Sequence, residues 1–383
     1  MLETETMRTR NPVVPLSILL FACSPSSQTH TDAATAGITR TAQDVAPTAP
    51  LTFEIEAGAV GVHLAATSDI AGDVVVIESL VGPEGTAWVS AGMPLGSLMT
   101  TDQGVQLATV TLPMTSAMQA QSLAAGTYTA TLSSFSGAPT LHTVVAVQHT
   151  PDGAFHGGVL DLDLFIPDGL VIQNPGRSHM IDATVAAQDA AVAARVDAFY
   201  ASALTLAGLD RGEVRFHAID ASLAKIVSQP EIDAVHEQTQ LIDTDRPSAR
   251  VIWSNQLYDG ATVWGQSGGI PGAGAMRGVI GSAVLLQVSP GASPVGDGMT
   301  MLHELGHFAG LFHTSDGGGG GDPIDDTPEC ADPSPDNYAA CEDSHNLMFP
   351  LYWGASGGKN VVLSDGQRRV FEASPLYRAT SRP

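Results

Sequence analysis

The segment 303–313, with the sequence HELGHFAGLFH, constrains this chain more than any other part of it. His303 and His307 are four residues apart, so one face of a helix would carry both and they could share a metal ion. Gly310 can adopt the left-handed conformation that ends a helix, which would let the chain turn and bring His313 to the same ion. Three imidazoles leave one tetrahedral position open, which is typical of a catalytic zinc site.

Glu304 lies beside the histidine face of this expected helix. A carboxylate in that place can accept a proton from a metal-bound water. The residues therefore predict a hydrolase with one zinc, in which Glu304 is the general base and then the general acid. The alternative is a solvated helix that carries histidines without binding metal.

These eleven residues resemble the extended zinc signature of the metzincin metallopeptidases. That family has a tight turn with a methionine beneath the metal, and the sequence NLMFP at 346–350, with Met348, resembles this turn. A flexible, polarisable thioether suits a position under histidine rings. The resemblance implies a zinc endopeptidase that cleaves proteins or peptides.

The same resemblance implies the fold class. We expect an α+β (α/β-like) metzincin catalytic domain over residues 151–383, with a twisted mixed sheet, a backing helix and a zinc helix. In that family an edge strand of the sheet lies above the cleft, and the substrate pairs with it as an additional strand.

A further stretch, GDPIDDTP at 321–328, follows the zinc motif and resembles the pappalysin branch of the metzincins. In that branch this loop can bind calcium. Asp322, Asp325 and Asp326 offer the oxygen ligands that calcium prefers, so Ca²⁺ is a second candidate metal. The alternative is that Asp, Gly and Pro only make turns here.

The sequence departs from the family pattern at one position. Many metzincins carry a tyrosine two residues after the turn methionine, where it can hydrogen-bond the reaction intermediate. Pro350 occupies that position here, and Tyr352 is the nearest tyrosine. Tyr352 is therefore the candidate for this catalytic role.

The amino-terminal residues predict export. Arg8 and Arg10 precede an apolar run over 13–22 that is too short to span a bilayer, so residues 1–22 are expected to be a signal peptide. LFAC at 20–23 resembles the bacterial lipoprotein processing site, which would place a lipid on Cys23. The protein is then an outer-membrane or cell-surface lipoprotein that meets the membrane only through this anchor; ordinary secretion into the extracellular medium is the alternative. A rival role for Cys23, as an inhibitory zinc ligand, is disfavoured by its place at the end of the apolar run.

The chain has three cysteines. If Cys23 carries a lipid, Cys330 and Cys341 remain as a pair. In an oxidising compartment a disulfide between them would stabilise the fold by about 3 kcal/mol. Two free thiols in the cytosol are the alternative.

Before the catalytic domain, residues 23–50 lack apolar periodicity and are expected to be a flexible tether. Residues 51–150 alternate in short runs between turns and predict an all-β sandwich, whose role as spacer, binding module or pro-domain is open. Its expected strands include Thr52–Ile55, Asp73–Leu80, Val105–Leu112 and Gly126–Leu132.

From residue 157 onward the pattern becomes that of mixed helices and strands. A long helix is expected to begin at a cap, Asp182, and to end at Gly208. The expected strands are Leu160–Leu164, Val214–Ile219, Arg250–Ser254 and Val279–Val288.

The net charge of −24 and the pI near 4.5 argue against a nucleic-acid partner, because phosphate binding needs clustered Lys and Arg. A monomer is expected. Two other functions stay open: a zinc amidohydrolase with a non-protein substrate, and an inactive or latent surface lipoprotein with a binding role. Glu304 is intact, which counts against an inactive domain.

Overall fold

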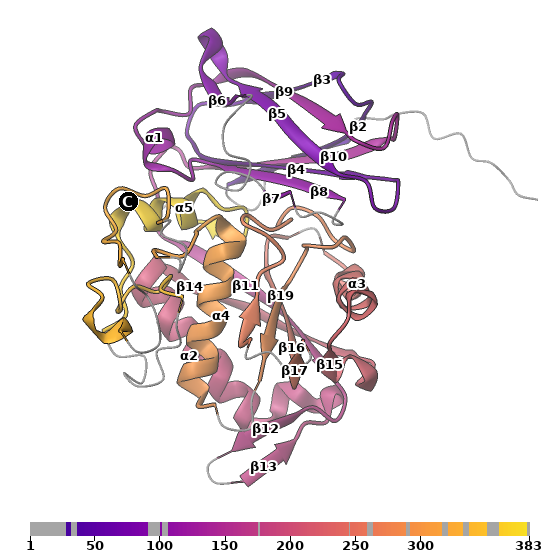
Figure 1. Ribbon diagram of the computed structural model, residues 1–383, viewed down its shortest axis with the longest axis vertical. Coiled ribbons are helices and arrows are strands. Elements are labelled where there is room, and N and C mark those ends of the chain that lie inside the picture. Colours follow the sequence, from indigo (N-terminus) through magenta and orange to yellow (C-terminus); the bar gives the residue numbers. More distant parts are fainter. Residues whose placement is uncertain are drawn as a thin grey trace, which may run out of the picture.

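The computed structural model has a mixed α+β fold with several sheets (Figure 1). The signal-peptide segment 1–22, the lipidation candidate Cys23 and the catalytic candidate Tyr352 lie outside the residues that the structure describes. Those residues are 28–31, 37–90, 100–101, 106–174, 177–244, 246–258, 263–288, 292–315, 321–331, 337–350 and 360–380.

Two antiparallel sheets form the amino-terminal part of the molecule (Figure 1). Side chains that alternate toward the inside of each sheet, such as Leu64, Val110, Ile77 and Leu132, belong to one buried cluster. The six-stranded sheet has the order β1 (Gln28–Thr31), β2 (Ile38–Val45), β10 (Leu141–His149), β4 (Ala59–Ser68), β8 (Leu107–Leu112) and β7 (Thr100–Thr101). The four-stranded sheet has the order β3 (Pro50–Ile55), β9 (Gly126–Ser134), β5 (Val75–Val81) and β6 (Ala87–Val89).

Strand β2 corrects the expected tether. The prediction that residues 23–50 are a flexible tether is wrong for Ile38–Val45, which pairs along its whole length with β10. The sequence ITRTAQDV offers no apolar alternation, and its side chains are half-buried or exposed. Backbone hydrogen bonds to β10 hold this strand, and they leave no hydrophobic pattern in a sequence.

A third sheet organises the carboxy-terminal part, with the order β14 (Leu209–Ile219), β11 (Gly158–Pro167), β16 (Ala249–Ser254), β19 (Val284–Gln287) and β18 (Gly265–Gln266). The first four strands are parallel, whereas β18 runs antiparallel at the edge. β20 (Arg378–Ala379) pairs with the start of β11. Two small two-stranded pairs lie apart from it: β12 (Val171–Asn174) with β13 (Arg177–Met180), and β15 (Lys225–Ile226) with β17 (Gln256–Leu257).

Helices cover both faces of this sheet (Figure 1). Leu160, Leu162 and Leu164 of β11 point into the core shared with α2 (Ala190–Ala207) and α4 (Pro294–Ala309). Phe165 points to the opposite face, where α3 (Gln229–Glu237) packs. α5 (Asp365–Ala373) contacts α4 and α2, and the short α1 (Ser116–Gln119) contacts α5.

Two expected boundaries in this part are wrong. Asp182 caps only the short 3₁₀ turn Ala183–Gln188, and α2 begins after a second cap, Asp189, whose carboxylate accepts hydrogen bonds from the first turn. The expected strand Val279–Val288 is a strand only over Val284–Gln287, because the preceding residues form turns.

A buried ion pair joins the two helices on the sheet. Arg195 of α2 donates from Nε to Asp297 Oδ2 of α4 at 2.6 Å, and both side chains are buried. By length and composition α2 could cross a membrane. Its pairing with α4 and its end at Gly208, which has a φ of 65°, are typical of a core helix.

The two parts of the molecule share one continuous core. All six residues of β8 are buried, so both of its faces are covered. Thr109 of β8 donates to Pro271 O at 2.5 Å, and Gln148 of β10 donates to Tyr377 O at 3.0 Å. The six-stranded sheet therefore lies between the four-stranded sheet and the carboxy-terminal part.

Candidate metal centre

Helix α4 carries the metal motif, and its two ends have recognisable local causes. Ser293 caps the start by accepting a hydrogen bond from the Gly296 N–H at 3.0 Å, and Pro294 fits the first helical position. Gly310 ends the helix with a φ of 126°, in the region that favours glycine. The expected helix end at Gly310 is confirmed, and the chain turns back there toward His313.

The three predicted ligands His303, His307 and His313 converge. Their candidate ligand atoms all lie within 4.8 Å of one another, and the Nε2 atoms of His307 and His313 are 3.1 Å apart. The Nδ1 atoms of His303 and His307 face the carbonyl oxygens of Leu347 and Leu311, each at 2.7 Å. These carbonyls orient both rings so that Nε2 faces the shared point.

The donor set fits zinc. Burial lowers the pKa of His303 to about 3 and that of His307 well below its usual value, so both imidazoles are neutral and able to bind a metal. Two nitrogens bound to one tetrahedral zinc lie about 3.3 Å apart, close to the spacing of His307 and His313. Three histidine nitrogens would leave one coordination position for water or substrate.

Glu304 follows His303 on α4, and its side chain lies against β18, the edge strand of the sheet. Burial raises the pKa of its carboxyl to about 8, although a hydrogen bond from the Ser267 N–H lowers it. A Cβ on Gly265 of β18 would lie 2.5 Å from Glu304 Cγ. Strand β18 can therefore pass directly over this carboxylate only because residue 265 has no side chain.

Met348 packs against α4 at Gly306. A Cβ on Gly306 would lie 2.6 Å from Met348 Sδ, so the missing side chain makes room for the sulfur. The turn is closed by a hydrogen bond from Phe349 N to Asn346 O at 3.1 Å, and Asn346 Oδ1 accepts from Met348 N at 2.8 Å. The turn also supplies Leu347 O, the carbonyl that orients His303.

Asp343 anchors the chain directly after His313. Its Oδ2 accepts hydrogen bonds from the Thr314 and Ser315 hydroxyls, both at 2.6 Å. Thr314 also donates its N–H to Met348 O at 3.1 Å. Asp343 thus connects the segment after His313 to the turn that contains Met348.

The expected disulfide between Cys330 and Cys341 is confirmed, with a Cα–Cα distance of 5.2 Å. The Cys330 N–H donates to Ser315 Oγ at 2.7 Å, so the disulfide loop is attached to the segment that follows His313. Asp343 lies beside it, with a carboxylate oxygen within 4.8 Å of both sulfur atoms.

The three calcium candidates do not form a ligand set among the described residues. Asp322 accepts from the Thr327 hydroxyl at 2.6 Å, and burial raises the pKa of its carboxyl to about 6. Asp326 accepts from Gly366 N, at the start of α5, at 2.9 Å. The Asp325 N–H donates to Ser116 Oγ of α1 at 2.8 Å. These aspartates hold their loop to its neighbours.

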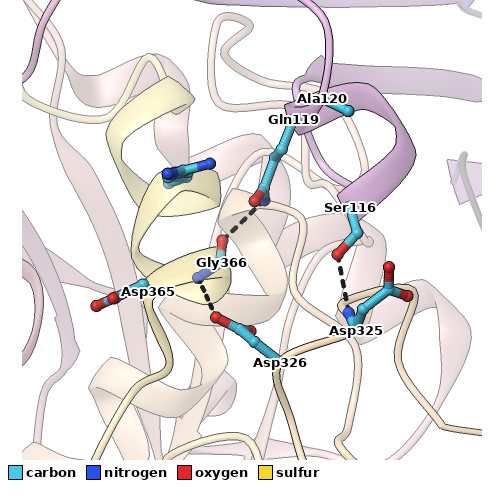
Figure 2. A pocket seen from close by; sticks show the side chains of 8 residues that line it. Ser116, Gln119, Ala120, Asp325, Asp326, Asp365 and Gly366 are labelled. Carbon is cyan, nitrogen blue, oxygen red and sulfur yellow. Dashed lines mark hydrogen bonds between the residues drawn. The ribbon is translucent and has the colours of Figure 1, made fainter.

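Asp325 and Asp326 also line a surface pocket of about 360 Å³, where α1, their loop and α5 meet (Figure 2). Figure 2 shows Gln119 of α1 directed at Gly366 of α5, and its side-chain amide donates to Gly366 O at 2.8 Å. The pocket marks a junction between the two parts of the molecule rather than a gathered set of metal ligands.

Three residues at the site are not predicted by the sequence: Gly265, Ser267 and Asp343. Gly265 and Ser267 carry no signal in the sequence, because their role depends on a strand that lies far from Glu304 in the chain. Gly306 differs from these three. Glycine inside a helix lowers its stability by about 1 kcal/mol relative to alanine, so a glycine within the histidine motif indicates a packing constraint.

Comparisons with known proteins give partial matches. No protein-family model matches the chain. The extracellular metalloprotease 1 of Coccidioides posadasii (strain C735) is 48% identical to it over 58 residues, which are 14% of this chain and 21% of that protein. The chain therefore matches about a fifth of the length of this curated relative.

Solved structures give similarities of low score. The archaemetzincin of Methanopyrus kandleri is 15% identical with a TM-score of 0.27, covering 58% of this chain and 91% of its own. Mirolysin is 14% identical with a TM-score of 0.34, covering 56% and 91%. Metalloproteinase-II from Bacteroides fragilis is 12% identical with a TM-score of 0.33, covering 61% and 62%. These neighbours and the curated relative are metallopeptidases. Because all three TM-scores are below 0.5, the assignment of the site rests on its own geometry.

Proposed function

We propose that this protein is a zinc-dependent endopeptidase of the metzincin type, close to the pappalysin branch. One observation carries the proposal: His303, His307 and His313 converge to within 4.8 Å beside the buried carboxyl of Glu304. If these histidines bound no metal, nothing would require the chain to turn at Gly310 and bring His313 back to His303 and His307. The α4 helix, Gly310 and the turn at Met348 support the same assignment.

In this proposal His303, His307 and His313 hold one zinc, and Met348 supports the site from below. A zinc ion held by these residues would polarise a substrate carbonyl and would lower the pKa of a bound water to about 7. Glu304 accepts a proton at its carboxylate from the attacking water and then donates it to the leaving amine. Bound zinc would lower the pKa of Glu304 through its positive charge, which leaves the carboxylate ionised and ready to act as a base.

Substrate would bind along β18. This strand pairs only with β19 in the described sheet, so its other edge can pair with an extended peptide. Gly265 brings the peptide backbone on that edge close to Glu304. A peptide substrate therefore agrees better with the site than a small non-protein amide, which would make no use of a strand edge.

We also propose that the protein is exported. The disulfide suits an oxidising compartment, and the partial relative is named an extracellular metalloprotease. Lipidation at Cys23 would anchor it at the outer membrane or cell surface; without it the protein would be secreted.

The test uses protein 24–383, expressed without its leader. We expect one zinc per chain by elemental analysis, and cleavage of a mixed peptide library that a chelator abolishes. Glu304→Gln should keep the zinc and lower kcat at least 100-fold, because a general base contributes about 10²–10⁴ in rate.

His313→Ala serves as the companion variant and should lose both zinc and activity. Unchanged cleavage by Glu304→Gln would rule out the mechanism. Folded wild-type protein without zinc would rule out the metal centre. Zinc without peptide cleavage would favour a latent enzyme or a non-peptide substrate.

A further inference from the structure

We propose that Asp343 is a positioning residue for the third zinc ligand, His313, an inference that rests on the zinc site proposed above. His303 and His307 lie on α4 and receive their orientation from carbonyl oxygens. His313 lies beyond the helix end at Gly310, so the rigidity of α4 does not fix it. The segment that follows it helps to fix the position of its backbone.

Asp343 holds that segment. The Thr314 and Ser315 hydroxyls both donate to Oδ2 of Asp343 at 2.6 Å, and the three side chains are buried. Hydrogen bonds to a carboxylate are stronger than those to a neutral acceptor. Because Thr314 is bonded to His313 through the backbone, fixing it limits how far the imidazole can move away from the other two ligands.

The segment is also fixed on its other sides. The Thr314 N–H donates to Met348 O at 3.1 Å, and Ser315 Oγ accepts from the Cys330 N–H at 2.7 Å. The carboxylate of Asp343 lies at the centre of these contacts. Its removal would leave two buried hydroxyls without their acceptor, next to a ligand that must be held within a fraction of an ångström.

A purely structural role would not explain the choice of a charged residue. Asp343 is 3% exposed, and its second oxygen, Oδ1, is buried without a hydrogen-bond partner among the described residues. Such a carboxylate costs stability compared with a neutral side chain. A role in holding two hydroxyls at once beside a metal ligand would explain why the acceptor is charged. Residues that orient metal ligands by hydrogen bonding have this role in other metal sites.

The experiment measures zinc release from protein 24–383 into excess chromophoric chelator. Asp343→Ala should release zinc at least tenfold faster than the wild type, since loss of such a partner lowers metal affinity about 10–100-fold. Asp343→Asn keeps the shape and one acceptor oxygen, so it should lie between the two. The cobalt-loaded Asp343→Ala protein should also show altered visible absorption bands.

Asp73→Ala is the matched control. Asp73 is equally buried and accepts from the Ser134 hydroxyl at 2.7 Å, but it lies in the amino-terminal sheets. This variant should lose stability and release zinc at the wild-type rate. If Asp73→Ala accelerates release as much as Asp343→Ala, general destabilisation explains the effect and the inference is overturned.

The remaining outcomes separate this inference from the proposed function. Tight zinc binding by the wild type, with equally slow release from Asp343→Ala, would overturn the inference and leave the metal centre intact. A wild type that binds no zinc would overturn both. If Asp343→Ala does not fold, Thr314→Val decides by the same criterion, because it removes one of the two hydroxyls.

Discussion

Gly306 lies between His303 and His307 on α4, and its missing side chain leaves room for Met348. Alanine at a helix interior normally stabilises by about 1 kcal/mol relative to glycine. Here its Cβ would lie 2.6 Å from Met348 Sδ, so something must move. We expect Gly306→Ala to lower the free energy of unfolding by about 1–3 kcal/mol, measured by urea denaturation.

A double-mutant cycle with Met348→Ala tests the cause of that loss. With the sulfur removed, Gly306→Ala should cost much less or become favourable, because the collision is gone. An equal cost in both backgrounds would show that Gly306 serves something other than the methionine.

At the residue scale the sequence reveals ligands better than the groups that support them. The spacing within residues 303–313 predicts the roles of His303, Glu304, His307 and Gly310. The structure brings the two helical histidines together with His313. Asp343 lies 30 residues beyond His313 and acts through two hydroxyls. No spacing rule connects residues so far apart, because the intervening loop decides whether they meet.

At the scale of elements, we expect the stability of the fold to depend on the buried ion pair between α2 and α4. Arg195 is fully buried, so Asp297→Ala would remove the carboxylate that pairs with its guanidinium and lower the free energy of unfolding by about 3–5 kcal/mol. Replacing both residues, as in Arg195→Met with Asp297→Leu, should be nearly neutral. Chemical denaturation of the three variants measures this, and a double variant as unstable as Asp297→Ala would contradict it.

The sheet edge formed by β11 and β14 should be sensitive to acid. Burial alone would raise the pKa of Asp163, but hydrogen bonds from Arg215 and His217 lower it well below its usual value. The stability that Asp163 contributes is therefore complete above its unfolded-state pKa of about 3.9, and it is lost as the pH falls below that value.

The measurement is the Tm of the wild type and of Asp163→Asn between pH 5.5 and pH 3. At pH 5.5 the wild type should be more stable by about 2 kcal/mol or more, because the variant leaves Arg215 short of its main partner. The difference should shrink toward pH 3. A constant difference across this range would show that the ionised form of Asp163 is not what stabilises the fold.

Secondary structure can be predicted from this sequence where apolar and polar residues alternate, and not where they do not. Alternating Leu and Asp predict strand β11, although both of its aspartates are buried and ion-paired rather than exposed. The sequence does not predict strand β2, because backbone pairing holds it. The sequence of the loop that carries Asp322 predicts calcium binding, and this stays a prediction; in the structure Asp322 accepts from the Thr327 hydroxyl and Asp326 accepts from Gly366 N.

At the scale of the whole molecule, the amino-terminal sheets and the carboxy-terminal part are joined by a shared core. Ala65 and Leu107 of the sheets pack with Ala273 and Met276 of the other part. The fragment 151–383 would expose this apolar surface. We expect it to have a low soluble yield and a Tm about 10 °C or more below that of the full chain, since the loss of a few kcal/mol has this effect at such a length.

A cut chain provides the control for that fragment. Cleavage at a protease site inserted in the exposed turn Asp152–Gly153 would break the covalent link between the two parts and leave their noncovalent contacts intact. The cut protein should stay associated in gel filtration and keep nearly the full Tm. Ready dissociation, or a fragment 151–383 as stable as the full chain, would show that the sheets are a removable attachment.

The close approach of β18 to Glu304 also bears on how this site can change over generations. Every amino-acid replacement at Gly265 adds at least one carbon atom, and the first of these would already lie 2.5 Å from the catalytic candidate. If the proposed function holds, a single codon change at this position would abolish activity while sparing the fold and the three candidate zinc ligands. Active descendants of this chain should then keep glycine at residue 265, and a relative with another residue there should have either a shifted edge strand or no peptidase activity.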